Sequence, residues 1–264
     1  MSKLSVIVLV GREELHIGRC LERLRGLCPQ QIFVVESQSG DQTHEIAVAK
    51  GALTVFHIYP GNQAEQFNWA LDNLKIEAPW ILRLDADEYL TDELTEEIKQ
   101  RLPILPGNVE GVVLKRRHYF AGGWAKHGTY PVRILRLFRT GKGRYAPNQL
   151  MDERIEVSGR VIEFENDFVD HSLISMDEWR AKHRDYARRE AQQVVNGKFH
   201  DPRKIAYYKL PPYFRAFVYF CIRYFLKGGF LDGKTGWMWN FWQGLWYRWI
   251  VDREIGRLRP RSEV

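Results

Sequence analysis

Two acidic residues, Asp85 and Asp87, follow the apolar run 80–84 with one residue between them. Residues i and i+2 leaving a strand can point the same way, so both carboxylates can converge on one hard cation. A divalent ion there could bridge the phosphates of a nucleotide diphosphate and neutralise that group as it departs. The alternative is a solvated turn ahead of a helix at Thr91, where acids also favour the helix N-terminus. The place of the pair, after the fourth strand of an alternating series, favours a metal site.

The elements that would hold this pair alternate between strand and helix. Four apolar runs have the length of buried strands, at 5–10, 31–35, 53–58 and 80–84. Between them, apolar residues recur at helical spacing, first as Ile17, Cys20, Leu21 and Leu24 and later as Phe67, Ala70, Leu71 and Leu74. A short helix from Thr43 should end at Gly51. The alternation predicts an α/β fold with a mostly parallel, Rossmann-like sheet and helices on both faces. Such sheets bind ligands at the carboxyl ends of their strands.

The pattern changes after Arg101. Residues 109–114, 132–138 and 161–169 are expected to be strands. Ser175 with Glu178 forms a capping box, which predicts a helix from Met176 to about Val195. We expect two closely fused parts, a catalytic domain at 1–170 and a helical region at 171–264.

Composition and charge limit the classes of protein. The chain has 264 residues, 45% of them hydrophobic, and a net charge of +6, which suits a folded domain with a smaller appendage. From Asp170 to Val264 there are 18 Lys and Arg against 10 Asp and Glu, so this part should meet something anionic. The three cysteines form no disulfide or metal pattern, and a reducing cytosol is the simplest setting. The run 4–10 is too short for a signal peptide, and no run of eighteen apolar residues predicts a spanning helix.

The C-terminal part contains two amphipathic helical patterns separated by Gly228 and Gly229. The first stripe is Phe214, Phe217, Val218, Cys221, Ile222 and Phe225, and the opposite face carries Arg215, Arg223 and Lys227. The second stripe is Met238, Phe241, Trp242, Leu245, Trp246 and Trp249. Helices rich in Trp, Phe and Arg suit a membrane interface, with the basic residues on anionic lipid. The alternative is a helical pair that packs on the catalytic domain or on a partner. The number of tryptophans favours the membrane.

Three ordered motifs resemble family 2 glycosyltransferases. Residues 34–43, Val-Val-Glu-Ser-Gln-Ser-Gly-Asp-Gln-Thr, resemble the nucleotide-binding turn of the family, usually V-V-D-S-G-S-x-D-x-T. Residues 66–71, Gln-Phe-Asn-Trp-Ala-Leu, resemble the next helix, and residues 82–88, Leu-Arg-Leu-Asp-Ala-Asp-Glu, resemble the D-x-D metal motif. Residues 225–233 also look familial. Within the family, the chain resembles the bacterial lipopolysaccharide-core β-glucosyltransferase branch.

The resemblance implies a GT-A fold and an inverting, metal-dependent transfer of a hexose-type sugar from a nucleotide diphosphate, with a UDP-sugar favoured. It places Glu36 and Asp41 near the base and ribose, although Asp is usual where Glu36 stands. The nucleotide-sugar site that it implies comprises Glu36, Asp41, Gln66, Asn68 and Asp85. The metal would be Mn²⁺ or Mg²⁺, held by Asp87 and Asp85, with His171 as a further candidate ligand because several GT-A enzymes use a late histidine. A lone histidine that only donates or accepts hydrogen bonds is the alternative.

An inverting transfer needs a carboxylate that takes the proton of the acceptor hydroxyl. The family places this acid downstream of the metal motif, where Asp152 and Glu153 stand. We favour Glu153 over Asp152, because the core-glucosyltransferase branch ends its local motif in Glu. A surface acid pair flanked by Arg154 is the alternative.

The acceptor implied is a glycolipid or lipid-linked surface-glycan precursor, and the protein is expected to be cytoplasmic and peripheral on the inner face of the bacterial inner membrane. A nucleotidyltransferase is the first alternative, but it would usually show a Gly-rich, basic loop after the first strand, which residues 10–14 lack. A nucleic-acid-binding protein is the second, but it gives the acidic turn no role, so we expect no nucleic acid. A catalytically inactive family member is the third.

Overall fold

The computed structural model describes residues 2–37, 40–146, 154–197 and 202–259. The chain divides into two compact units, which are considered one at a time. Unit 1 comprises Met1–Arg117 and Pro131–Leu173, and unit 2 comprises His118–Tyr130 and Ile174–Val264. The expected division into a catalytic domain at 1–170 and a membrane-interfacial region at 171–264 concerns function and stays a prediction.

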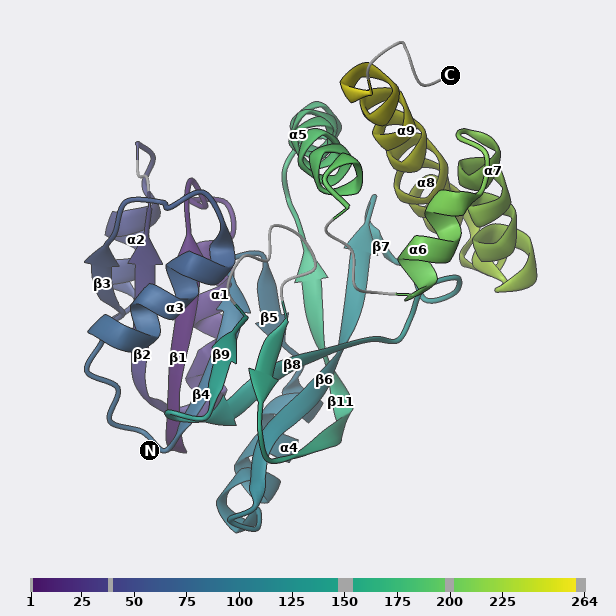
Figure 1. Cartoon of the computed structure of the whole chain (residues 1–264). Coiled ribbons are helices and arrows are strands. Elements are labelled where there is room, and N and C mark those ends of the chain that lie inside the picture. The colour runs from purple at the N-terminus through teal and green to yellow at the C-terminus, as the bar shows by residue number, and fades with distance from the viewer. Residues whose placement is uncertain (1, 38–39, 147–153, 198–201, 260–264) are drawn as a thin grey trace. The chain divides into compact units, whose positions relative to one another are not determined.

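Unit 1 is built on a mixed β-sheet (Figure 1). Its order begins with four parallel strands, β3 (Leu53–Phe56), β2 (Pro29–Glu36), β1 (Ser2–Val10) and β4 (Trp80–Asp85). The order continues through β8 (Val132–Arg139), β6 (Val109–Phe120), β11 (Arg160–His171) and β5 (Glu88–Leu90). Here β8 is antiparallel to β4 and to β6, and β5 is antiparallel to β11. Strand β4 therefore marks the change from the parallel to the antiparallel part.

Helices cover both faces of the parallel part. On β1, the side chains of Leu4, Val6, Val8 and Val10 enter one core, and those of Ile7 and Leu9 enter the other, as the two-residue period of a strand requires. The first core is closed by α1 (Ile17–Leu24), α2 (Thr43–Ala49) and α4 (Asp92–Arg101), and the second by α3 (Gln63–Asn73), β9 (Gly143–Tyr145) and β10 (Ile155–Val157). Short 3₁₀ turns follow α1 at Arg25–Leu27 and α4 at Leu102–Ile104. The predicted α/β architecture is confirmed.

The turn that carries the acidic pair leads into a short strand that the sequence did not indicate. The chain does not pass directly from Asp87 to the helix at Thr91. It first forms β5, which pairs with β11, and Thr91 then caps α4 by accepting a hydrogen bond from the Leu94 N–H. Strand β5 is three residues long and has no independent sequence signal, because its pairing partner lies about 80 residues away, a distance that local propensity cannot register.

In its described residues, unit 2 is helical apart from β7 (Gly123–Trp124) and the end of β6 at 118–120, with which β7 pairs. Its α-helices are α5 (Met176–Val195), α6 (Pro202–Lys209), α7 (Phe214–Cys221), α8 (Gly233–Trp239) and α9 (Tyr247–Leu258), with π-helical turns η3 (Ile222–Leu226) and η5 (Asn240–Trp246) and the 3₁₀ turn η4 (Gly229–Asp232). The capping box of Ser175 and Glu178 begins α5 as predicted. Ala187 and Ala191 of α5 pack on Ile250 and Val251 of α9. No helix in the described ranges is long and apolar enough to cross a membrane.

The expected exposure of two arginines in the first amphipathic pattern was wrong. Arg215 and Arg223, assigned to anionic lipid, are buried, whereas Phe214, Phe217 and Phe225 of the apolar stripe are exposed, as that assignment requires. The reason is Asp252 of α9, which accepts hydrogen bonds from Arg215 inside unit 2 and draws the basic face of α7 inward. The second stripe is also corrected in part, because Trp242 and Trp246 pack against the core formed by Phe120, Ala125, Trp179 and Trp239.

Candidate functional site

The acidic turn lies at the carboxyl edge of the parallel strands. In the ladder, Leu9 of β1 is opposite Asp85 of β4, and Val10 of β1 is opposite Glu36 of β2. The metal-site candidate and the nucleotide-site candidate are therefore separated only by β1, at the edge where such sheets bind ligands. This juxtaposition was predicted from the alternation of strands and helices.

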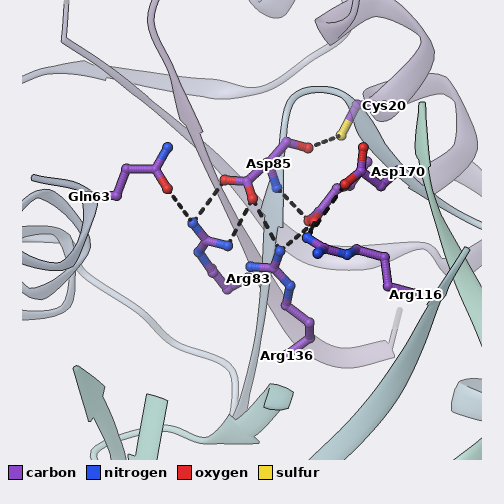
Figure 2. A network of polar contacts seen from close by, with 8 residues as sticks. Cys20, Gln63, Arg83, Asp85, Arg116, Arg136 and Asp170 are labelled. Carbon is purple, nitrogen blue, oxygen red and sulfur yellow. Dashed lines mark hydrogen bonds and ion pairs between the residues drawn. The ribbon is translucent and has the colours of Figure 1, made fainter. Parts of the chain in front are cut away.

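Two arginines hold the carboxylate of Asp85 (Figure 2). Arg83 donates from both terminal nitrogens, at 3.0 Å to Oδ2 and 2.8 Å to Oδ1, and Arg136 Nη2 lies 3.1 Å from Oδ2. Arg83 also donates to Gln63 Oε1 of α3 at 3.1 Å. Bidentate guanidinium–carboxylate bonds fix orientation as well as charge, so Asp85 is held in one direction before any ligand arrives.

Glu88 lies beneath the same turn, with its side chain only 1% exposed. Its Oε2 accepts the backbone N–H of Asp85 at 2.9 Å, and its Oε1 pairs with Arg136. Arg116 Nη1 lies 3.9 Å from Glu88 Oε1 and 3.4 Å from Asp170 Oδ2. Burial, followed by the charge of Asp85, raises the pKa of Glu88 well above its usual value, against the opposing effect of Arg83 and Arg116.

The negative charge of the turn also affects the pKa of the buried Cys20 thiol on α1. Burial first, and then the carboxylates of Glu88, Asp87 and Asp85, raise the pKa of Cys20 far above its usual value. The thiol stays protonated, and its Sγ lies 3.9 Å from the carbonyl oxygen of Asp85. It packs behind the site as a small apolar group.

Asp87 and His171 meet through the backbone. The His171 N–H donates to the Asp87 carbonyl at 3.0 Å, which continues the ladder in which Asp170 is opposite Glu88. Directly opposed residues of antiparallel strands have Cβ atoms about 5 Å apart. The fold therefore brings together two metal-ligand candidates that are far apart in sequence.

The imidazole of His171 is engaged by Arg19 of α1. Arg19 Nη1 lies 3.1 Å from His171 Nδ1, and a guanidinium only donates, so Nδ1 accepts and a neutral ring carries its proton on Nε2. Arg19 also donates to the carbonyl oxygen of His171. Burial and then the charge of Arg19 lower the pKa of His171, so the ring is neutral near pH 7. Binding a metal at Nδ1 would require Arg19 to release it.

The donor set fits a metal that is shared with a substrate. In the described part of the chain, no three His, Cys, Asp or Glu side chains form a group that could hold a metal ion. Mg²⁺ is usually bound by one or two carboxylates together with substrate phosphates and water. The carboxylate of Asp85 contacts Arg83 and Arg136, and the carboxylate of Asp170 contacts Arg116. A pair of carboxylates of this kind fits an ion shared with phosphates, and the assignment of Asp87 and Asp85 as its ligands stays a prediction.

In the described part of the predicted nucleotide loop, at 34–37 and 40–43, hydrogen bonds form around Glu36 and Asp41. The buried Glu36 carboxylate accepts from His44 Nδ1 at 2.7 Å, and the bond raises the pKa of His44. Asp41 Oδ1 accepts from the backbone N–H and the hydroxyl of Thr43, at 3.1 and 2.6 Å, and Oδ2 accepts from the backbone N–H of Glu14 at 3.2 Å. Burial acts to raise the pKa of Asp41, but these bonds outweigh it and lower the pKa. Asp41 is therefore charged near pH 7.

Gln66 and Asn68 support this region from α3. Gln66 Oε1 lies 2.8 Å from His57 Nδ1 and its Nε2 donates to the His57 carbonyl at 3.2 Å, while the His57 ring stacks on Trp69. The Asn68 amide exchanges two hydrogen bonds with the backbone of Tyr145, at 3.0 and 3.1 Å. Both amides are thus committed to protein groups, and their assignment as nucleotide-sugar contacts stays a prediction.

Asp152 and Glu153, the candidates for the catalytic base, lie outside the described residues, so their roles also stay predictions. Sequence reasoning gave no role to Arg83, Arg136 and Glu88. The available signal was Arg83 inside the apolar strand β4, and Arg136 as the central one of three arginines in β8, because a buried arginine requires an acidic partner.

The chain is similar in sequence to known proteins over most of its length. The family model described as "Glycosyl transferase family 2" matches residues 5–158. The "Lipopolysaccharide core biosynthesis glycosyltransferase LpsC" of Rhizobium meliloti (strain 1021) is 32% identical over 98% of this chain and 96% of its own length. An uncharacterized glycosyltransferase of Rickettsia bellii is 23% identical over 87% of this chain and 81% of its own.

Solved structures give a more distant likeness. A crystal structure of glucosyl-3-phosphoglycerate synthase from Mycobacterium tuberculosis in complex with Mn²⁺ and UDP-glucose is 19% identical, with a TM-score of 0.36. The match covers 44% of this chain and 43% of the synthase chain, so this protein spans less than half of that structure.

Proposed function

Because the chain belongs to glycosyltransferase family 2 and has the GT-A fold, we propose that it moves a hexose from a nucleotide diphosphate donor to a lipid-linked or lipopolysaccharide precursor, with inversion at the anomeric carbon. The observation that supports this best is the placement of Asp85 and Asp87 at the carboxyl edge of the sheet, one strand away from Glu36. A UDP-sugar is the favoured donor.

The donor would lie along this edge. In the proposal, Glu36 and Asp41 accept hydrogen bonds from the base and ribose, and the lowered pKa of Asp41 suits that role. Asp85 faces the sugar-phosphate part, with Arg83 and Arg136 fixing its direction. A carboxylate held in place before binding loses little orientational freedom when the donor arrives.

Mn²⁺ or Mg²⁺ would be held by Asp87 and Asp85, with His171 able to join if Arg19 moves aside. When bound, the ion supplies positive charge against the departing diphosphate. The protein residues keep the turn rigid, because Glu88 accepts the Asp85 N–H and the backbone of His171 is bonded to that of Asp87.

The acceptor side is proposed from sequence and from the relative. Glu153, or Asp152 in its place, would take the proton of the acceptor hydroxyl as that oxygen attacks the anomeric carbon. The relative in Rhizobium meliloti is named for lipopolysaccharide core biosynthesis, which supports an acceptor of that class. Such an acceptor would place the protein on the cytoplasmic face of the inner membrane, with 1–170 as the catalytic part and 171–264 as the interfacial part.

A panel of nucleotide-sugars tests the proposal. The purified protein would be incubated with each donor in Mn²⁺ or Mg²⁺, and release of the free nucleotide would be measured. We expect one UDP-hexose to be turned over faster than the others, and faster again with a lipopolysaccharide-core acceptor. If no donor is turned over while nucleoside triphosphates are consumed, the protein is a nucleotidyltransferase and the proposal is wrong.

A further inference from the structure

Helix α7 of unit 2 buries its basic face and exposes its apolar face, which is the reverse of an ordinary amphipathic helix. Arg215 of α7 is 4% exposed, and it donates to Asp252 and to the backbone carbonyls of Tyr208 and Leu210. The large apolar residues at 214, 217, 222 and 225 are exposed. In water this arrangement leaves apolar surface uncovered, while the buried charge is compensated by Asp252.

The uncovered residues continue beyond α7 into one cluster. We call Phe225, Leu226, Phe230, Leu231 and Trp237 the apolar tip. The ring of Tyr224 connects its aromatic members, with centroids 5.1 Å from Phe225, 6.3 Å from Phe230 and 5.6 Å from Trp237. Leu226 is 82% exposed and Leu231 is 62% exposed, which are high values for leucine in a folded domain.

In the sequence segment that contains the apolar tip, the exposed charges have one sign. From Arg203 to Val251, Asp232 is the only acidic residue in the sequence, and its buried carboxylate is bonded to His127 Nδ1 and to the His127 N–H. Lys227 and Lys234, which lie between members of the tip in the sequence, are exposed. An apolar surface bordered by cations is complementary to a membrane with anionic headgroups.

We propose that the apolar tip is a membrane-docking surface, with Leu226 and Leu231 entering the headgroup boundary while Lys227 and Lys234 contact anionic lipid. The proposal deepens the proposed transfer to a lipid-linked acceptor by naming the surface that would bring unit 2 to the bilayer. A twofold dimer through the same surface is disfavoured, because it would bring the lysines of two copies together without an exposed acid to pair with them.

Vesicle flotation of the full-length protein tests the docking surface. We expect the wild-type protein to float with phosphatidylglycerol–phosphatidylethanolamine vesicles and to float less with phosphatidylcholine vesicles. L226S/L231S should lower the partition coefficient by about tenfold or more, because two exposed leucines no longer enter the interface. K227Q/K234Q should lower it by about 30-fold, since each lysine near an anionic surface contributes about fivefold.

Matched controls come from unit 1. Ile104 is 78% exposed, so I104S removes a comparable apolar side chain, and Lys75→Gln removes an exposed lysine. Both controls should float like the wild-type protein. Thermal melting of all variants should stay close to that of the wild-type protein, because none of the four substituted tip and lysine residues is buried.

Three results would overturn the docking surface. The first is wild-type protein that does not float. The second is L226S/L231S protein that floats as well as wild type. The third is a wild-type dimer that L226S/L231S converts to a monomer in sedimentation, because a second copy would then cover the tip. Donor turnover without vesicles separates the two proposals. Protein that floats through the tip but turns over no nucleotide-sugar supports docking and overturns sugar transfer.

Discussion

The guanidinium of Arg136, on β8, lies between two carboxylates of the acidic turn, with Nη2 at 3.1 Å from Asp85 Oδ2 and in contact with Glu88 Oε1. The side chains of Arg136 and Glu88 are both almost fully buried. The antiparallel part of the sheet thereby fixes a turn that the parallel part carries. This link makes the turn a rigid element of unit 1.

Removal of Arg136 should therefore destabilise unit 1. We expect Arg136→Met to lower the free energy of unfolding by about 3–5 kcal/mol, because Glu88 would be left buried beside Asp85 without the guanidinium that contacts its Oε1. Arg133→Met is the control, since Arg133 lies on the same strand in an exposed pair with Glu163 and should cost less than about 1 kcal/mol. Chemical denaturation measures both variants. Equal stability of Arg136→Met and wild type would show that the link is not stabilising.

Unit 2 also contains a buried carboxylate that is paired with an arginine. Glu190 of α5 accepts from the hydroxyls of Tyr208 and Tyr247, at 2.7 and 2.6 Å, and from Arg248 at 2.7 Å. Burial acts to raise the pKa of Glu190, but Arg248 and the two tyrosines outweigh it and lower the pKa. At pH 7, Glu190→Gln should cost about 3 kcal/mol, since the buried charge of Arg248 loses its partner.

The sign of the pH effect follows from the lowered pKa. A carboxylate with a lowered folded-state pKa stabilises the protein above its unfolded pKa, about 4.3, and this contribution is lost as the pH falls through the folded-state pKa. The stability difference between wild type and Glu190→Gln should shrink over that acid range. Asp185→Asn, which removes an exposed partner of Arg188 on the same helix, should change stability little at any pH. A difference that grows on acidification would contradict this account.

His44 should give a pH effect of the opposite sign. Its bond to Glu36 raises the pKa of His44, so the pair stabilises the fold fully below the usual histidine pKa of about 6.5 and is lost as the pH rises through the raised value. Wild type should exceed His44→Gln in melting temperature at pH 6 and lose that advantage at alkaline pH. The same substitution in a Glu36→Gln background should show no such dependence. An advantage that persists unchanged at pH 9.5 would mean that the histidine charge is not involved.

The parallel part of the fold was predictable because its signals are local. The stripe of Ile17, Cys20, Leu21 and Leu24 is fully buried on α1, and the capping box at Ser175 begins α5 at the predicted residue. The position of Asp85 at a strand end followed from the same reasoning, because parallel strands separated by helices bring their carboxyl ends to one edge.

The predictions that were wrong or missing concern residues whose interaction partners are distant in the sequence. Periodicity placed Arg215 and the phenylalanines of α7 on opposite faces, which is correct, but it could not determine which face turns inward. That choice depends on Asp252, which lies 37 residues away. The hydrogen bond from Arg136 to Asp85 was missed for the same reason, since the two residues are 51 positions apart in the sequence. Hydrophobic patterns do not encode such pairs, because the energy of a buried charge is set by its partner.

The catalytic base is a prediction from sequence alone. If Glu153 removes the acceptor proton, Glu153→Gln should bind the donor normally and transfer about 100-fold more slowly or worse, because only the transition state loses a proton acceptor. Asp152→Asn is the matched neighbour and should retain most of the activity. Single-turnover rates and donor titrations measure the two effects, and NMR of the product should show an inverted anomeric configuration. A dead Asp152→Asn with an active Glu153→Gln would move the role by one residue, and retention of configuration would refute the mechanism.

Turnover of the preferred nucleotide-sugar with and without a divalent ion tests the central claim most directly. The account predicts activity in Mn²⁺ or Mg²⁺, none in EDTA, and recovery when excess metal is added. Asp87→Ala should lose at least about 100-fold, as expected when charge stabilisation at the leaving group is removed. Asp92→Ala, whose side chain is 88% exposed in the same acidic segment, should keep its activity. Full turnover in EDTA, or by the Asp87→Ala variant, would contradict a metal-assisted transfer at this turn.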